Sequence, residues 1–123
     1  MPPALPVVRS RWRWLAPALA AATILVGTSI PRLPMPAGSW DKGWHFAGYA
    51  LLGLTLGWAV GGPWRRLALA FAGLVVFGAL DELHQSWIPG RSTDPADWLA
   101  DSAGGATGLA LIAALTRRQE SGS

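Results

Sequence analysis

Four long apolar stretches run through the 123-residue chain and limit what it can fold into. They cover residues 15–30, 44–60, 67–80 and 98–115. With 51% hydrophobic and only 14% charged residues, the chain lacks the polar side chains that would cover a water-soluble domain. A helix of about 20 apolar residues spans the hydrocarbon core of a bilayer. The sequence therefore predicts an all-α fold, an integral membrane bundle of four transmembrane helices.

The third stretch is too short to cross a bilayer unless its helix continues into the polar residues that follow it. If the helix runs on to Ile88, where Pro89 and Gly90 break it, it becomes long enough. Tryptophan favours the membrane–water interface, and every Trp falls at the end of a proposed span. These residues are Trp12, Trp14, Trp40, Trp44, Trp58, Trp64, Trp87 and Trp98. The spacing of the Trp residues thus supports the same four spans.

Basic residues predict the orientation, because cytoplasmic flanks of membrane spans carry the excess of Lys and Arg. Seven basic residues lie on the side of the termini and the middle loop: Arg9, Arg11, Arg13, Arg65, Arg66, Arg117 and Arg118. Three lie on the opposite side: Arg32, Lys42 and Arg91. Both termini should therefore be cytoplasmic. We divide the chain into a cytoplasmic extension (residues 1–14), the transmembrane domain (15–116) and a cytoplasmic polar tail (117–123). A cleaved signal peptide is the alternative for the first span, but the pattern after it is a poor cleavage site.

Several functional classes lack their usual signals in this chain. The net charge of +3 comes from short basic flanks of apolar spans rather than from a basic polar domain, so we expect no nucleic-acid partner. The absence of Cys excludes disulfides, thiolate metal sites and cysteine nucleophiles. No H-E-x-x-H spacing and no phosphate-binding loop occurs. The local spacing therefore predicts no metal site and no cofactor.

Polar residues instead gather at the predicted outer ends of the spans. Lys42, His45 and Tyr49 share one face at the start of the second span, and Asp41, one turn before His45, could fix its tautomer. Asp81, His84 and Gln85 share a face where the third span ends, with Glu82 beside them. The fourth span starts with Asp94, Asp97 and Asp101 on one face. A polar cluster at the outer membrane boundary is therefore expected.

Each group also has a purely structural interpretation. Asp94 followed by Pro95 is typical of a helix start, with Asp94 as the N-cap. His45, Tyr49 and Gln85 could serve only as hydrogen-bond partners between helices. Asp81, Glu82 and Asp101 are more indicative of function, because ionisable residues at or inside a bilayer boundary are costly. So many carboxylates must hold a proton, a cation or a basic partner, or stay in contact with water.

In this order the motifs closely resemble the VanZ-like family. They are Asp41-Lys42-x-x-His45-Phe46-x-x-Tyr49, then Asp81-Glu82-x-His84-Gln85 with Pro89-Gly90-Arg91, then Asp97-x-x-x-Asp101-x-x-Gly104. The resemblance implies a small bacterial protein of four transmembrane helices in the cytoplasmic membrane, from a family named for a member associated with teicoplanin resistance. The residues of this chain that match the family's motif positions are Asp41, Lys42, His45, Tyr49, Asp81, Glu82, Gln85, Arg91, Asp97 and Gly104. Asp101 departs from the pattern, which usually has Asn there.

Three functional hypotheses follow, each from a different class. In the first, the outer cluster binds a lipid-linked head group or cell-wall precursor. Lys42 and Arg91 contact its phosphate or carboxylate groups. Its hydroxyl and amide groups contact Tyr49, Gln85, Asp81, Glu82, Asp97 and Asp101. In the second, the chain is an enzyme with Glu82 or Asp81 as general base and His45 as general acid. In the third, it is an accessory assembly protein: the cluster only holds the helices together, and a partner membrane protein supplies the activity. Self-association into a homo-oligomer is the alternative to such a partner. A transporter is less favoured, since the acids cluster at one face.

Overall fold

The structure, a computed structural model, describes residues 11–31 and 41–122. A short 3-10 turn (Arg11–Trp14) leads into helix α1 (Leu15–Ser29), and three longer helices follow: α2 (Asp41–Val60), α3 (Trp64–Gln85) and α4 (Pro95–Ser121). The described ranges contain no strand. The predicted all-α fold with four helices is thus confirmed for this part of the chain.

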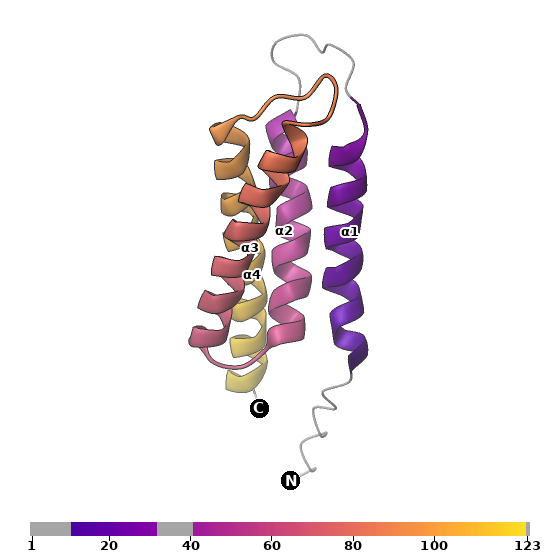
Figure 1. Ribbon diagram of the computed structural model, residues 1–123. Coiled ribbons are helices and arrows are strands. Elements are labelled where there is room, and N and C mark those ends of the chain that lie inside the picture. The colour runs from indigo at the N-terminus through magenta and orange to yellow at the C-terminus, as the bar shows by residue number, and fades with distance from the viewer. Residues whose placement is uncertain (1–10, 32–40, 123) are drawn as a thin grey trace.

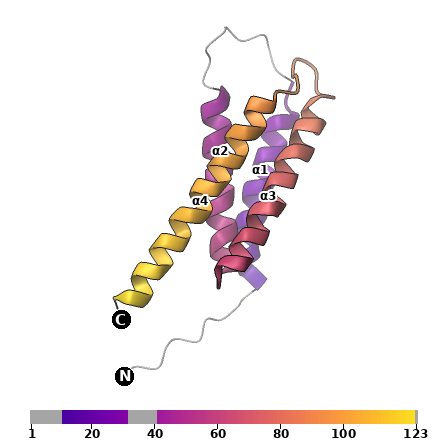
Figure 2. The ribbon, with the colours of Figure 1, turned by 90° about the vertical axis from the view of Figure 1, so that its left-hand side faces the viewer.

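The four helices form an up-and-down bundle (Figure 1). The start of α1, the turn between α2 and α3 and the end of α4 lie at one end, which we call the arginine end because it carries Arg13, Arg65, Arg66, Arg117 and Arg118. The start of α2, the end of α3 and the start of α4 lie at the opposite end, which we call the cluster end. Figure 2 shows that α4 diverges from the other helices toward its C-terminal end.

The helix boundaries differ from the predicted ones by a few residues. Helix α3 continues through the polar residues, as expected, but ends at Gln85, three residues before the predicted Ile88, and a turn with Gly90 at φ 78° follows. Helix α4 begins at Pro95 with Asp94 as its N-cap, because the Asp94 carboxylate accepts a hydrogen bond from the Ala96 amide at 2.9 Å. The helix then runs on to Ser121, so residues 117–121 of the predicted polar tail are helical.

Two helices, α3 and α4, are long and apolar enough to cross a membrane. Helix α1, at 15 residues, is shorter than a typical span. The four-span topology and the cytoplasmic position of both termini therefore stay predictions.

Helices α2 and α4 make the most extensive contact in the bundle, through glycines. A Cβ atom at Gly104 would overlap the carbonyl oxygen of Phe46, and one at Gly53 would overlap that of Gly105. Gly108 approaches the α2 backbone in the same way. Small residues let two helix backbones come this close, and the resulting packing contributes to helix association inside a membrane. Gly53 with Gly57, and Gly104 with Gly108, stand four positions apart, so each pair of small residues lies on one face of its helix.

The described residues bury as many polar side chains as apolar ones. The six buried polar residues are Thr28, Asp81, Glu82, Gln85, Asp97 and Asp101, against six buried hydrophobic residues that include Tyr49, Leu52 and Leu74. Large apolar side chains such as Leu69 and Val76 lie exposed on the outside of the bundle. An apolar exterior around a partly polar interior suits a lipid environment and would be unfavourable in water.

Candidate functional site

Buried polar side chains from all four helices meet at the cluster end. We call this group the polar cluster; its members are Thr28 of α1, His45 and Tyr49 of α2, Asp81, Glu82 and Gln85 of α3, and Asp97 and Asp101 of α4. The glycine contacts between α2 and α4 hold the N-terminal halves of these two helices together, which brings their polar residues close at this end. Helix packing therefore determines which polar residues can touch.

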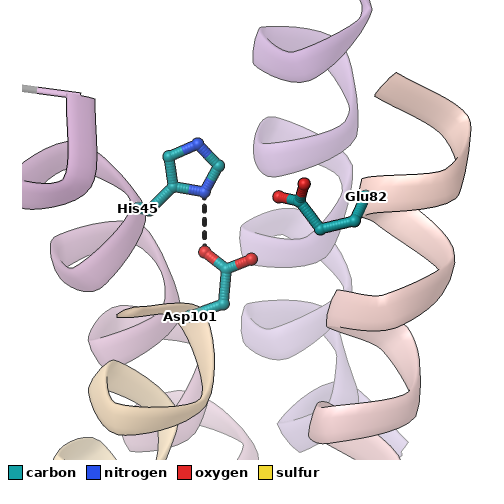
Figure 3. Close-up of side chains that lie close together, drawn as sticks. All are labelled: His45, Glu82 and Asp101. Atoms are coloured by element: carbon teal, nitrogen blue, oxygen red, sulfur yellow. Dashed lines mark hydrogen bonds and ion pairs between the residues drawn. The ribbon is translucent and has the colours of Figure 1, made fainter. Parts of the chain in front are cut away.

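His45 and Asp101 form the shortest contact of the polar cluster. His45 Nδ1 lies 2.7 Å from Asp101 Oδ1, and the two side chains are 8% and 0% exposed (Figure 3). On the other side of the ring, His45 Nε2 lies 4.0 Å from Asp97 Oδ2, an ion-pair distance that is too long for a hydrogen bond. Two carboxylates thus flank the two nitrogens of one imidazole, and Asp101 holds the orientation of the ring.

Glu82 faces this pair from α3. Its carboxylate is directed across the gap toward His45 and Asp101, and one donor atom from each of the three residues lies within 4.8 Å of the others (Figure 3). Glu82 Oε2 accepts a hydrogen bond from the Asp94 amide at 3.2 Å, and Glu82 Oε1 accepts one from Gln85 Nε2 at 3.4 Å. The Oδ2 atom of Asp101 is buried and has no hydrogen-bond partner.

Asp81 is placed differently from its neighbour Glu82. Its Oδ1 accepts a hydrogen bond from the Thr28 hydroxyl at 2.8 Å, and its Oδ2 accepts one from the Tyr49 hydroxyl at 3.1 Å and a longer one from Gln85 Nε2 at 3.5 Å. Donors from α1, α2 and α3 therefore converge on one carboxylate. Asp81 joins three helices, and its hydrogen-bonding capacity is largely used in doing so.

Lys42 lies at the exposed edge of the polar cluster. Its Nζ is 3.4 Å from Asp94 Oδ2 and 3.6 Å from Asp97 Oδ1, and its side chain is 60% exposed. The hydrogen bond to Asp94 raises the pKa of Lys42 above its usual 10.5. The Ala96 amide, and after it Lys42, lower the pKa of Asp94 below its usual 3.8. Lys42 is the point at which the polar cluster meets the surrounding solvent.

Arg91 contacts the end of α1. Its Nε donates to the Ile30 carbonyl oxygen at 3.0 Å, and its Nη2 donates to the Gly27 carbonyl oxygen at 2.9 Å. A guanidinium at a helix C-terminus satisfies carbonyl groups that have no partner inside the helix. Arg91 therefore ties the connection between α3 and α4 to α1.

The structure brings most of the predicted site residues together. Lys42, His45 and Tyr49 do share one face of α2, and each pairs with an acidic residue of α3 or the α4 region. The Asp41 side chain and Arg32 lie outside the described residues; the carboxylate that orients His45 in this structure is Asp101. Thr28 was missed, because a lone Thr in an apolar helix usually bonds to its own backbone.

Four buried carboxylates, those of Asp81, Glu82, Asp97 and Asp101, determine the chemistry of the polar cluster. Buried carboxylates are costly unless paired or hydrogen-bonded, and Lys42 offsets part of this charge from the edge. The arrangement is therefore suited to holding a proton, a cation or a hydrogen-bond donor. His45 between two carboxylates can also take up and release a proton.

A comparison with protein families finds a match that covers most of the chain. The model of the VanZ/LLP1 family matches residues 5–116, a range that contains the whole polar cluster. No curated protein and no solved structure matches the chain.

Proposed function

The chain belongs to the VanZ/LLP1 family, and from this premise we propose that it is a multi-pass protein of the bacterial cytoplasmic membrane. The polar cluster binds the head group of a lipid-linked envelope component or cell-wall precursor on the extracytoplasmic side. By binding it, the protein lowers susceptibility to teicoplanin-type glycopeptides. Two helices of membrane-spanning length and the apolar exterior of the bundle support the membrane location.

One observation carries the proposed site: a buried group of ionisable side chains lies at one end of a bundle with an apolar exterior. Such groups are expensive to hold near a bilayer, and they usually mark a binding or transfer site. The arginines at the opposite end support the orientation, because basic flanks favour the cytoplasmic side. The polar cluster would then lie at the outer leaflet, where lipid-linked wall precursors are used.

The contacts within the polar cluster indicate which groups of a ligand would bind. Carboxylate oxygens accept hydrogen bonds, so Glu82, Asp97 and Asp101 suit hydroxyl, amide or ammonium groups of a head group. Lys42, exposed at the edge, supplies a cation for a phosphate. Arg91 was expected to share that role, but two of its donor groups bond to carbonyl oxygens at the end of α1. Lys42 is the more exposed of the two cations, and Arg91 stays a predicted anion contact beside it.

An enzyme that modifies the same lipid is the second candidate. The 2.7 Å contact between His45 and Asp101 favours it, because a carboxylate that orients a histidine is a common element of acid–base sites. Glu82 across the gap would be the second proton-transfer group. Turnover distinguishes the two: purified protein that binds a wall-precursor lipid and leaves it unmodified after long incubation is a binding protein.

The direct test is the teicoplanin susceptibility of a host lacking the protein that expresses either wild type or Glu82→Gln. The substitution replaces a charge with an amide of nearly the same shape. Glu120→Gln, near the end of α4 at the arginine end, is the matched control. Membrane levels of all three proteins are matched by immunoblot.

We expect wild type and Glu120→Gln to protect the host and Glu82→Gln to lose the protection at equal abundance. Equal protection by all three would assign Glu82 a structural role and favour the accessory-assembly hypothesis. Absence of protection by wild type would show that this family member has no part in glycopeptide resistance.

A further inference from the structure

Three side chains of the polar cluster form an arrangement that also fits a metal ion. We propose that His45, Glu82 and Asp101 bind a divalent transition-metal ion of the Zn²⁺ type. Each residue comes from a different helix, α2, α3 and α4 respectively (Figure 3). Each offers one donor atom, and the three atoms lie within 4.8 Å of one another.

The distances fit a metal site that closes slightly on loading. Zn²⁺ binds nitrogen and oxygen at about 2.0–2.2 Å, so tetrahedral ligand atoms lie about 3.4 Å apart. Because the three atoms lie within 4.8 Å of one another, the widest pair has to approach by at most about 1.4 Å. His45 Nδ1 and Asp101 Oδ1, at 2.7 Å, have to separate slightly as the metal ion replaces the proton between them. Rotations of the Glu82 and Asp101 side chains can provide shifts of this size.

The Asp101 carboxylate independently indicates a ligand. Its side chain is 0% exposed, and Oδ2 has no hydrogen-bond partner. In Figure 3 this second oxygen points away from His45 and toward Glu82. A buried carboxylate oxygen without a donor is costly, and a cation in the gap would remove that cost. The neighbouring Asp81 shows what a carboxylate with a structural role looks like here, since donors from three helices bond to it.

The residues around the three ligands also suit a metal site. A metal-bound histidine usually gives its other ring N–H to a carboxylate, which orients the ring and makes the metal-binding nitrogen more basic. Asp97 Oδ2, 4.0 Å from His45 Nε2, is positioned to accept that hydrogen bond after a small shift. The Asp94 amide and Gln85 hold the two oxygens of Glu82.

The donor set indicates the class of metal. One imidazole nitrogen with two carboxylate oxygens, and no thiolate, suits Zn²⁺ or Mn²⁺, and Zn²⁺ binds such sites more tightly. Three protein ligands leave at least one coordination position for water or for an oxygen of a ligand. If the proposed function holds, that position is where a phosphate or hydroxyl of the lipid head group would meet the metal. The proposed site itself requires neither lipid nor antibiotic.

The experiment uses the purified full-length chain in detergent, with an affinity tag that contains no histidine. The protein is stripped with EDTA, dialysed to equilibrium against Zn²⁺, and analysed for bound metal. We expect one saturable Zn²⁺ per chain. His45→Ala, Glu82→Gln and Asp101→Asn should each weaken binding by about 100-fold, since loss of a direct ligand costs at least as much as loss of an orienting residue. The matched controls His84→Ala and Glu120→Gln should bind as wild type does.

Absence of saturable Zn²⁺ binding by wild type would overturn the proposal, as would equal binding by Asp101→Asn. Thermal unfolding of each metal-free variant shows whether it folds. If the ligand variants do not fold, the visible absorption of wild type loaded with Co²⁺ decides the question: ligand-field bands at one equivalent support the site, and the spectrum of the free aqueous ion refutes it. These measurements use neither lipid nor antibiotic. Metal binding can therefore be found even if the susceptibility test fails, and the susceptibility test can succeed even if no metal binds.

Discussion

The two ends of the bundle are built in different ways. At the cluster end, carboxylates are buried among helices that nearly touch. At the arginine end, Arg65, Arg66, Arg117 and Arg118 are exposed, and a hollow of about 870 Å³ lies between the α2–α3 turn and the end of α4. An apolar groove of about 530 Å³ between α1, α2 and α3 extends from this end toward the middle of the bundle.

The difference shows which end holds side chains in a defined geometry. Glycines set the separation of α2 and α4 near the polar cluster, whereas α4 diverges from the bundle toward the arginine end (Figure 2). A site that recognises a small group needs its side chains held to within a fraction of an ångström, which only the cluster end provides. The loosely packed end can instead adjust to lipid or to a partner protein.

Substitution of glycine at the two kinds of position should give the largest contrast. Gly104→Leu places a side chain against the Phe46 carbonyl oxygen and pushes α4 away from α2. We expect it to destabilise the fold by about 3 kcal/mol or more, because two backbones must move. Gly73→Leu, at a position with no atom within 4 Å of the added Cβ, should change the stability by less than about 0.5 kcal/mol. Thermal unfolding of the purified proteins in one detergent measures both.

Similar losses from both glycine variants would contradict the comparison, because the α2–α4 contact would then be no more tightly packed than the apolar groove that Gly73 lines. Gly104→Ala tests whether a single methyl group, without the rest of a Leu side chain, is enough to disturb the contact between α2 and α4. Even its single methyl group meets the Phe46 backbone, so it should already lower the melting temperature measurably.

Much of the fold could be predicted because its signals are local. Apolar runs predict the helices, and Asp94 before Pro95 predicts the start of α4. Which helices contact each other through glycines is known only from the structure. Helical periodicity also placed Lys42, His45 and Tyr49 on one face. The end of α4 was less predictable, because a polar sequence such as residues 117–121 can continue a helix in water as easily as end it.

The roles within the polar cluster could not be read from the sequence. Asp81 and Glu82 are adjacent, yet one joins three helices and the other faces His45 and Asp101. That distinction depends on how far each helix is rotated against its neighbours, which hydrophobic patterning fixes only coarsely. The grouping proposed to bind metal draws one residue from each of three helices, so no local spacing motif could indicate it.

The hydrogen bonds that hold α1 at each end should give an effect of intermediate size. At the cluster end, Asp81→Ala leaves the buried Tyr49 hydroxyl without its acceptor and the Thr28 hydroxyl with only the Leu25 carbonyl oxygen, 3.3 Å away, and we expect a loss of about 2 kcal/mol. At the arginine end, Arg13 donates to the Trp58 carbonyl oxygen at 2.9 Å in an exposed position. Arg13→Ala should cost about 0.5 kcal/mol. Chemical unfolding monitored by tryptophan fluorescence compares the two; a larger loss from Arg13→Ala would reverse their order.

The smallest expected effect concerns the ion pair of Lys42 and Asp94, which lies at the exposed edge of the polar cluster. Because the folded pKa of Asp94 is below its usual 3.8, its contribution to stability is full above that value and is lost as the pH falls through the folded pKa. The raised pKa of Lys42 has the opposite sign: its contribution is full below 10.5 and is lost as the pH rises through the folded pKa.

The difference in melting temperature between wild type and Asp94→Asn should therefore be constant from about pH 5 to pH 9 and shrink below about pH 4. Asn keeps the N-cap, so the charge is the main change. Lys42→Gln is the matched control. With Gln at position 42, the melting-temperature difference caused by Asp94→Asn should change less at alkaline pH. It should keep most of its change at acid pH, because the Ala96 amide is the larger cause of the low Asp94 pKa. A difference that also varies through neutral pH would mean that Asp94 is coupled to His45 through Asp97, and that the exposed edge and the buried cluster titrate as one unit.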